Sequence, residues 1–448
     1  MLPDYLSKAS PNPASNRGPW FSNTAPTYAG IFLWVAFYSQ MAEGTLTVAH
    51  LRVCLAALVI AAILCYALFY RVPATLGMKT GYPLYVVGSS TFGTKGGYLM
   101  PGLLMGLLQI GWFAVATYLS SDFILKGLGI VSAPMTPSFI ITGALWGLVM
   151  ASIAAKGIQY VAKVASILNW IPLLMLLIVI AKTAGGIGHH QLAAGAVPND
   201  FAAVTTIIAG VIGFFATAGA AGTDFGTNAR NDSDVKWGGL VGVGLAILVA
   251  GGLPLASVAG AHGLGLVGAD KWNYADVVQA IGGSMASVMF FLFAIASIPA
   301  TCFCSFIAGN SFSTMIPGVP RVSSSMIGAV VGIILAVTGA AANLISFFSI
   351  VGASFGPIIG AMTADYMLSG RKWAGPREGI NMAGYLAWAV GFIVGILPFL
   401  PLPDSIKPYV QPAGLYSFIA GYIVYGIAAK AGLQPKVVPM PVATAAAA

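Results

Sequence analysis

One short stretch of the chain combines a flat aromatic side chain with a hydrogen-bonding amide. In the apolar run 108–114, Gln109 precedes Trp112 by three residues, so in a helix the two side chains share a face. A glutamine amide carries two N–H donors and an acceptor, and an indole offers a flat apolar surface. The pair suits a planar heterocycle that stacks on the ring and is hydrogen-bonded at its edge. A tryptophan packed between helices beside an interhelical glutamine is the alternative.

A second aromatic pair, Phe214 and Phe215, directly follows Gly213 and could supply the opposite surface of the same site. Glycines interrupt this apolar segment repeatedly between residues 209 and 219, and Gly30 interrupts an earlier one more weakly. In transporters built from inverted repeats, such discontinuous helices turn free backbone groups toward the substrate and the coupling ion. Glycines that only allow close helix packing are the alternative.

Hydroxyl side chains recur every four residues along another apolar segment, at Ser297, Thr301 and Ser305. This spacing places the three hydroxyls on one helix face. Hydroxyl oxygens and freed carbonyls can bind a hard cation such as sodium. Hydroxyls that donate to carbonyls of their own helix are the alternative.

Ionisable residues within the apolar segments are few. Glu43 lies near the outer end of the first segment, and Asp224 and Asp365 lie at the inner ends of the sixth and tenth. A carboxylate in such a segment is a functional candidate, and Glu43 is a candidate for gating or proton coupling. The four histidines lack metal-ligand spacing, and neither a phosphate loop nor a nucleophile elbow is present. The sequence therefore predicts neither an enzyme nor a bound cofactor.

The elements that carry these residues are predicted to be membrane-spanning helices. Of the 448 residues, 58% are hydrophobic and 7% are charged, with a mean hydropathy of +0.89, whereas soluble domains have about 25% charged residues. A span needs about 20 apolar residues, and the runs are too long and continuous for strands. We predict an all-α protein with about twelve spans, near residues 27–47, 53–73, 98–120, 136–155, 162–182, 201–222, 238–261, 282–308, 324–341, 344–367, 382–400 and 413–431.

The distribution of Lys and Arg predicts how these spans are oriented. With the N-terminus in the cytoplasm, fifteen of the 20 basic residues fall in inner loops and tails and five in outer loops. This bias predicts that both termini lie on the cytoplasmic side of the inner or plasma membrane. The net charge of +8 is spread over short loops, so no nucleic-acid partner is expected. The lipid bilayer is the expected surrounding.

Three further stretches resemble a known family. They are residues 76–115, with Ser90-Thr-Phe-Gly-Thr-Lys and Gln109-Ile-Gly-Trp; residues 223–231, Thr-Asp-Phe-Gly-Thr-Asn-Ala-Arg-Asn; and residues 356–367, with Gly-Pro-Ile-Ile-Gly and Ala-Asp-Tyr-Met. In order and spacing they are similar to the nucleobase:cation symporter family, also called the purine/cytosine permease family, and in particular to its bacterial cytosine permeases. The resemblance spans roughly residues 25–430.

This resemblance implies the leucine-transporter fold, with ten core helices in two inverted five-helix repeats plus two more helices. It divides the chain into a cytoplasmic tail, a single transmembrane domain and a second cytoplasmic tail, at residues 1–24, 25–432 and 433–448. The inverted repeats are then expected at about 25–183 and 200–368, with the extra helices at 380–432.

The resemblance also assigns roles to residues. Gln109 and Trp112 match the family's amide and stacking tryptophan. Gly213, Phe214 and Phe215 match the break in segment 6, with Phe215 as the second aromatic, and Ala218 is expected to line the pocket. The ion site is expected to combine carbonyls near Phe32, Val35 and Ala36 with the hydroxyls of Ser297 and Thr301. Segment 8 lacks the family's asparagine, which leaves sodium and protons both open as the coupling ion.

The predicted function is import of a small planar heterocycle by cation symport with alternating access. The candidate solutes are cytosine, purines, uracil, hydantoin, allantoin and thiamine precursors. The solute is expected to stack between Trp112 and Phe215. The alternative is an amino-acid or amine symporter of the same fold. No pattern in the sequence indicates an oligomeric state.

Overall fold

The fold was analysed in a computed structural model of the chain, which describes residues 2–156, 168, 170–193, 195–403 and 405–440. Within these ranges the chain is helical, with no β-strand and only two isolated bridges, Gly18 with Ala229 and Arg377 with Val437. This agrees with the predicted all-α class.

Ten helical stretches of the described chain are long and apolar enough to cross a membrane. Two predicted spans are shorter: the ninth is a helix of 17 residues, Arg321–Val337, and the first is interrupted. Together they are consistent with about twelve spans. The predicted start of the fifth span, at 162–167, lies outside the described residues.

The α-helices are α1 (Asp4–Ser7), α2 (Thr24–Phe32), α3 (Val35–Tyr38), α4 (Leu51–Leu64), α5 (Arg71–Thr80), α6 (Leu84–Val87), α7 (Ser89–Phe92), α8 (Leu104–Gly127), α9 (Pro137–Lys156), α11 (Trp170–Thr183), α12 (Asp200–Ala220), α13 (Gly222–Gly226), α14 (Asp232–Gly239), α15 (Ala246–Gly263), α16 (Tyr274–Gly282), α17 (Ser284–Ala296), α18 (Ile298–Met315), α19 (Arg321–Val337), α20 (Leu344–Leu368), α21 (Met382–Ile396) and α22 (Ala413–Lys430).

The first segment is broken, as the resemblance implied. Trp34, between α2 and α3, is extended, with φ −68° and ψ 130°, and this conformation interrupts the i to i−4 hydrogen bonds of a continuous helix. Beyond Tyr38 the chain forms turns rather than helix, including Gly44 at φ +75°. The predicted helical span up to residue 47 is therefore wrong in its outer part.

The sixth segment is not broken at Gly213. Helix α12 runs without interruption from Asp200 to Ala220, and the chain leaves it at Ala221 before α13. Gly213 allows close packing instead, because a Cβ atom there would overlap the backbone carbonyl of Phe348 in α20. The prediction of a break at this glycine is therefore wrong. The alternative, a glycine that allows two helices to pack closely, is correct for Gly213.

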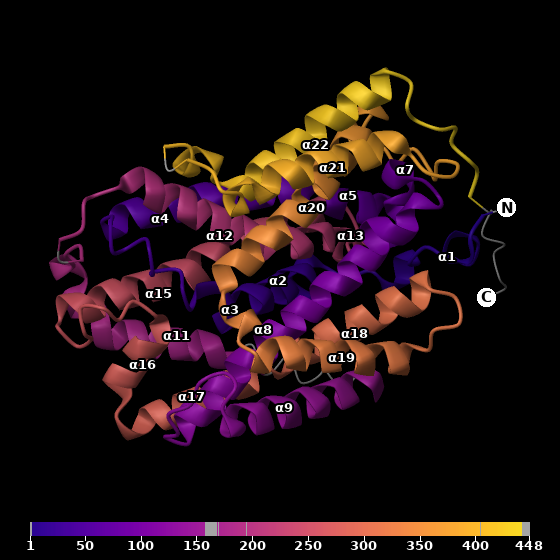
Figure 1. Cartoon of the computed structure of the whole chain (residues 1–448). Coiled ribbons are helices and arrows are strands. Elements are labelled where there is room, and N and C mark those ends of the chain that lie inside the picture. Colours follow the sequence, from indigo (N-terminus) through magenta and orange to yellow (C-terminus); the bar gives the residue numbers. More distant parts are fainter. Residues whose placement is uncertain (1, 157–167, 169, 194, 404, 441–448) are drawn as a thin grey trace.

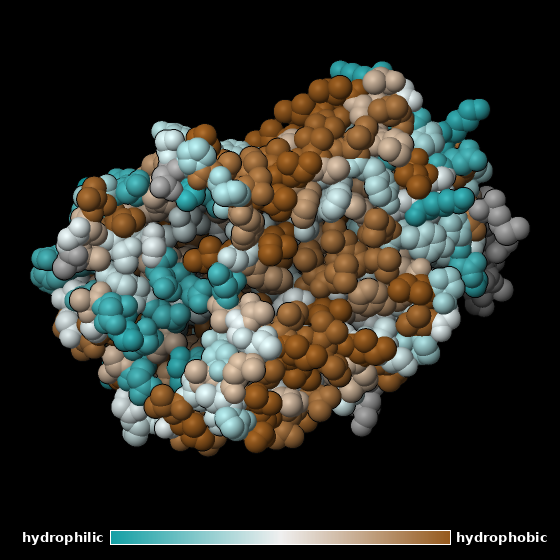
Figure 2. Space-filling model, in the orientation of Figure 1, coloured by the Kyte–Doolittle hydropathy of each residue, from teal (hydrophilic) through white to brown (hydrophobic). Residues whose placement is uncertain are grey.

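The helices pack in two groups, with the broken first segment between them (Figure 1). In one group α12 packs against α4 and α20, and α20 packs against α21 and α22. In the other, α8 packs against α9, α17, α18 and α19. The outer surface carries a broad apolar area, with hydrophilic residues gathered toward the two ends of the molecule (Figure 2). This distribution is what a bilayer requires.

The two ends of the described chain meet on one side of the molecule. Leu2 and Met440 pack on the same small cluster, around the buried side chains of Tyr5 and Leu6. The N-terminal residues are fixed to this end by hydrogen bonds, including one of 2.8 Å from the Tyr5 hydroxyl to the carbonyl oxygen of Thr94. An even number of spans places the two ends of the described chain on one side, which is the arrangement found.

Candidate functional site

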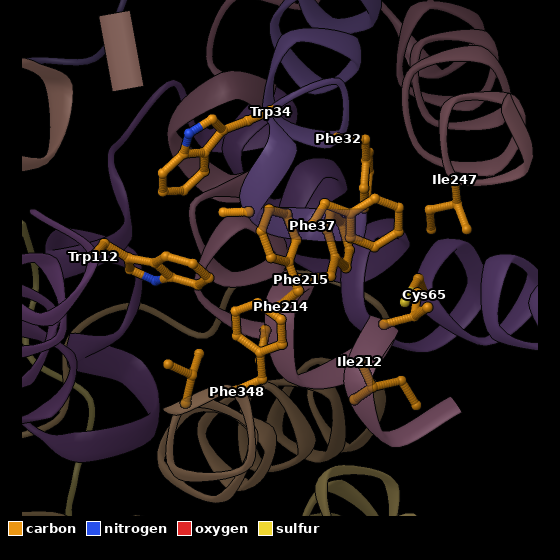
Figure 3. Packing of buried hydrophobic residues seen from close by; sticks show 14 of the residues in the cluster. Phe32, Trp34, Phe37, Cys65, Trp112, Ile212, Phe214, Phe215, Ile247 and Phe348 are labelled. Carbon is orange, nitrogen blue, oxygen red and sulfur yellow. The ribbon is translucent and has the colours of Figure 1, made fainter. Parts of the chain in front are cut away.

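A cluster of aromatic side chains surrounds the break in the first segment (Figure 3). The Trp112 ring lies 5.1 Å from that of Phe214 and 5.8 Å from that of Trp34, measured between centroids. The Phe348 ring from α20 lies 5.5 Å from Trp112 and 5.3 Å from Phe214. Three separate helices and the chain break therefore bring these rings together, and all four side chains are buried.

The aromatic partner of Trp112 on α12 is Phe214, not Phe215. Phe215 lies stacked on Phe32, with 5.5 Å between centroids and 22° between planes, and it also contacts Tyr28. Consecutive residues of a helix project about 100° apart, so only one of the two phenylalanines can face α8. The predicted sandwich between Trp112 and Phe215 is not the arrangement found.

Gln109 is buried next to this cluster without a strong hydrogen-bond partner. Its side chain is 8% exposed. Its one hydrogen bond within the described chain runs from Nε2 to the Sδ atom of Met105, at 3.7 Å, and a thioether is a weak acceptor. A buried amide is normally well satisfied. The amide is therefore available for a ligand that lies against Trp112.

Trp34 supplies a second unpaired donor that the sequence analysis did not single out. Its indole Nε1 is buried and has no hydrogen-bond partner among the described residues. The Nε1 of Trp112, by contrast, donates to the Thr217 hydroxyl at 3.2 Å. The sequence signal for Trp34 was its place shortly after Gly30, where the first apolar segment is weakly interrupted.

The hydroxyls of the two residues expected to bind a cation, Ser297 and Thr301, are both already hydrogen-bonded in the described chain. The Ser297 hydroxyl contacts that of Ser120 in α8 and donates to the Ala294 carbonyl at 2.7 Å. The Thr301 hydroxyl donates to the Ser297 carbonyl at 2.8 Å. These contacts match the alternative in which hydroxyls bond within their own helix. Phe32, Val35 and Ala36 are buried around the break at Trp34.

The remaining candidates are Ala218 and Glu43. The backbone carbonyl of Ala218 accepts a hydrogen bond of 3.0 Å from the Tyr28 hydroxyl. Glu43 is exposed and lines an open cavity of about 100 Å³, together with Gln40, Phe37 and Phe348.

Two curated relatives from Escherichia coli (strain K12) are similar to the chain over most of its length. The first, named "Putative allantoin permease", is 24% identical over 399 residues, which cover 78% of each chain. The second, cytosine permease, is 25% identical over 331 residues, which cover 71% of this chain and 73% of the relative.

Among solved structures, the chain shares the fold of Mhp1, a nucleobase-cation-symport-1 family transporter solved in a closed conformation with bromovinylhydantoin bound. The TM-score is 0.71 at 17% identity, over 96% of this chain and 95% of Mhp1. The transporter fold expected from the resemblance is thereby confirmed. A family model described as "Permease for cytosine/purines, uracil, thiamine, allantoin" matches residues 11–421. The chain therefore belongs to this permease family, and it is a membrane transporter rather than an enzyme.

Proposed function

We propose that this permease imports a neutral, planar nitrogen heterocycle by cation symport. Support for the solute class comes from the family and from relatives named for cytosine and allantoin. The observation that carries the proposal is the Gln109 amide, which is buried beside Trp112 with only a thioether as its partner. A heterocycle with a ring carbonyl and N–H groups would satisfy that amide while it stacks on the indole.

The solute binds between Trp112 and Phe214 in this proposal, and the Trp34 N–H is a further donor. The two rings stand 5.1 Å apart, edge to face, whereas a ring held between two others needs about 7 Å, twice the usual contact distance. Binding therefore requires the Trp112 and Phe214 rings to move apart. This opening is one half of an alternating-access cycle, and closure around the solute is the other.

The coupling ion is sodium or a proton in this proposal. An ion drives import only if it binds one conformation more tightly than the other, and binding of ion and solute must then favour each other reciprocally. The extended conformation of Trp34 leaves backbone carbonyls at the end of α2 without the N–H donors that a continuing helix would supply. These free carbonyl oxygens favour a cation near Phe32 to Ala36. Ser297 and Thr301 would have to leave their present hydrogen bonds to join such a site. Glu43 is the candidate for a proton-coupled cycle.

Uptake into proteoliposomes tests the proposal. Radiolabelled cytosine, uracil, hypoxanthine, allantoin and hydantoin are supplied with a sodium gradient, with a proton gradient, or with neither. One heterocycle should accumulate under one gradient. Gln109→Leu should lower kcat/KM at least about tenfold, because a buried hydrogen bond to the solute is lost. Met105→Leu removes only the thioether partner and should leave uptake unchanged.

Two results would reject the site or the solute class. Uptake that is unaffected by Gln109→Leu would show that the Gln109 amide does not bind the solute. Accumulation of an amino acid or amine, with no heterocycle carried, would establish the alternative symporter of the same fold.

A further inference from the structure

An open cavity of about 100 Å³ lies beside the aromatic cluster. It is lined by the start of α20, by α3 and the turns after it, by the middle of α12, and by Gln411 just before α22. Helix α20 leads from this cavity to Asp365, which pairs with Arg377, and the backbone of Arg377 pairs with Val437 near the C-terminus. With both termini in the cytoplasm, the cavity faces the outside.

Only one layer of aromatic rings separates the cavity from the candidate solute site. Phe37 and Phe348 line the cavity. The same two rings contact Phe214, with centroid distances of 4.9 Å and 5.3 Å. Phe214 in turn contacts Trp112. A solute in the cavity would therefore rest on the rings that close the inner site.

The polar groups of the cavity wall are incompletely paired. Glu43 is exposed and forms no ion pair within the described chain. The amide oxygen of Gln411 accepts from the Ala413 N–H at 3.0 Å, and no hydrogen bond from its amide nitrogen occurs within the described residues. Gln40 donates to the Ala342 carbonyl at 3.3 Å. A carboxylate and two carboxamides are thus presented above an aromatic floor.

We propose that this cavity is an outer binding site, where a neutral or cationic heterocycle with N–H groups binds before it passes Phe37 and Phe348. An ionised carboxylate only accepts hydrogen bonds, so Glu43 selects solutes that offer N–H donors and repels anionic ones. The rings of the floor provide the stacking surface. The identity of the solute rests on the proposed function, whereas the preference for positive charge rests on Glu43 alone.

The charge preference is measured with a single introduced cysteine. The four native cysteines are all buried, so the cysteine of Ser349→Cys, in the cavity wall, reports the local reaction rate. A cationic methanethiosulfonate should react faster than an anionic one of similar size. Adding Glu43→Gln should lower the ratio of the cationic to the anionic reaction rate roughly fivefold, because the Coulomb interaction with a unit charge several ångströms away is lost. Thr338→Cys, an exposed control outside the cavity wall, should show no change with Glu43→Gln.

Solute binding is then measured by protection of the same cysteine. In a Trp112→Ala background, which disables the inner site, the transported heterocycle should still slow labelling of Ser349→Cys. Addition of Glu43→Lys should abolish this protection, and orotate, an anionic ring, should never protect. The proposal of an outer site would be overturned if Glu43→Gln left the ratio of the two labelling rates unchanged. It would also be overturned if Trp112→Ala alone removed the protection. If no heterocycle is carried at all, the rate ratio still tests the cavity separately from the proposed function.

Discussion

A buried ion pair at the end of α20 allows a quantitative test of the structure. An Nη2 atom of Arg377 lies 2.7 Å from Oδ1 of Asp365, and the two side chains are 7% and 5% exposed. The other carboxylate oxygen contacts the hydroxyls of Ser90 and Thr91. The pair thus joins the loop after α20 to α7. Arg377→Met would leave the Asp365 carboxylate buried without its cation.

The expected cost of Arg377→Met is about 3–5 kcal/mol, the usual range when one partner of a buried pair is removed. For a chain of 448 residues, the entropy of unfolding gives a shift on the order of 1 °C per kcal/mol. The melting temperature should therefore fall by about 3–5 °C. A thiol-reactive fluorophore can follow melting in detergent, because all four cysteines are buried in the folded protein.

Two control variants separate this effect from simple loss of charge. Arg71 pairs with Asp232 at 2.8 Å, but these side chains are 30% and 62% exposed, so Arg71→Met should cost at most about 1 kcal/mol. Arg377→Met combined with Asp365→Asn should recover part of the lost stability, since the stranded charge is gone. An Arg377→Met protein that melts within a degree of both wild type and Arg71→Met would refute the reasoning.

Three further predictions concern packing, donors and the N-terminal segment. Gly213→Ala should lower stability by about 1–3 kcal/mol and reduce uptake, because the new methyl group would overlap the α20 backbone. Gly426→Ala in α22, with open space around its Cβ position and outside the cavity wall, should do neither in the same melting and uptake assays. Trp34→Phe should raise the melting temperature, because it removes an unpaired buried donor, and it should raise KM, because that donor is then lost to the solute. A higher KM with lower stability would instead indicate that Trp34 acts through packing. Tyr5→Ala should speed tryptic cleavage after the exposed Lys8, since the hydrogen bond to the Thr94 carbonyl is lost; unchanged cleavage would show that this contact does not hold the segment.

The close contacts of the glycines illustrate what sequence patterns leave open. Repeated glycines in segment 6 are compatible with a broken helix and with close packing alike. The choice depends on whether another backbone lies nearby, and at Gly213 the Phe348 carbonyl does. The actual break in the first segment falls at Trp34, which has no unusual local sequence apart from neighbouring Gly30. Backbone conformation there is set by what the residue packs against.

The sequence by itself determined the class of molecule, most of its spans and the shared face of Gln109 and Trp112. These follow from composition and from the helical period, which are local properties. Only the tertiary structure decided that Phe214 rather than Phe215 meets Trp112, that the Ser297 hydroxyl turns toward α8, and that Trp34 joins the aromatic cluster. Each depends on the rotation of one helix about its axis relative to another. The helices here are apolar on nearly all sides, so hydrophobic patterning does not fix that rotation, and packing of particular side chains does.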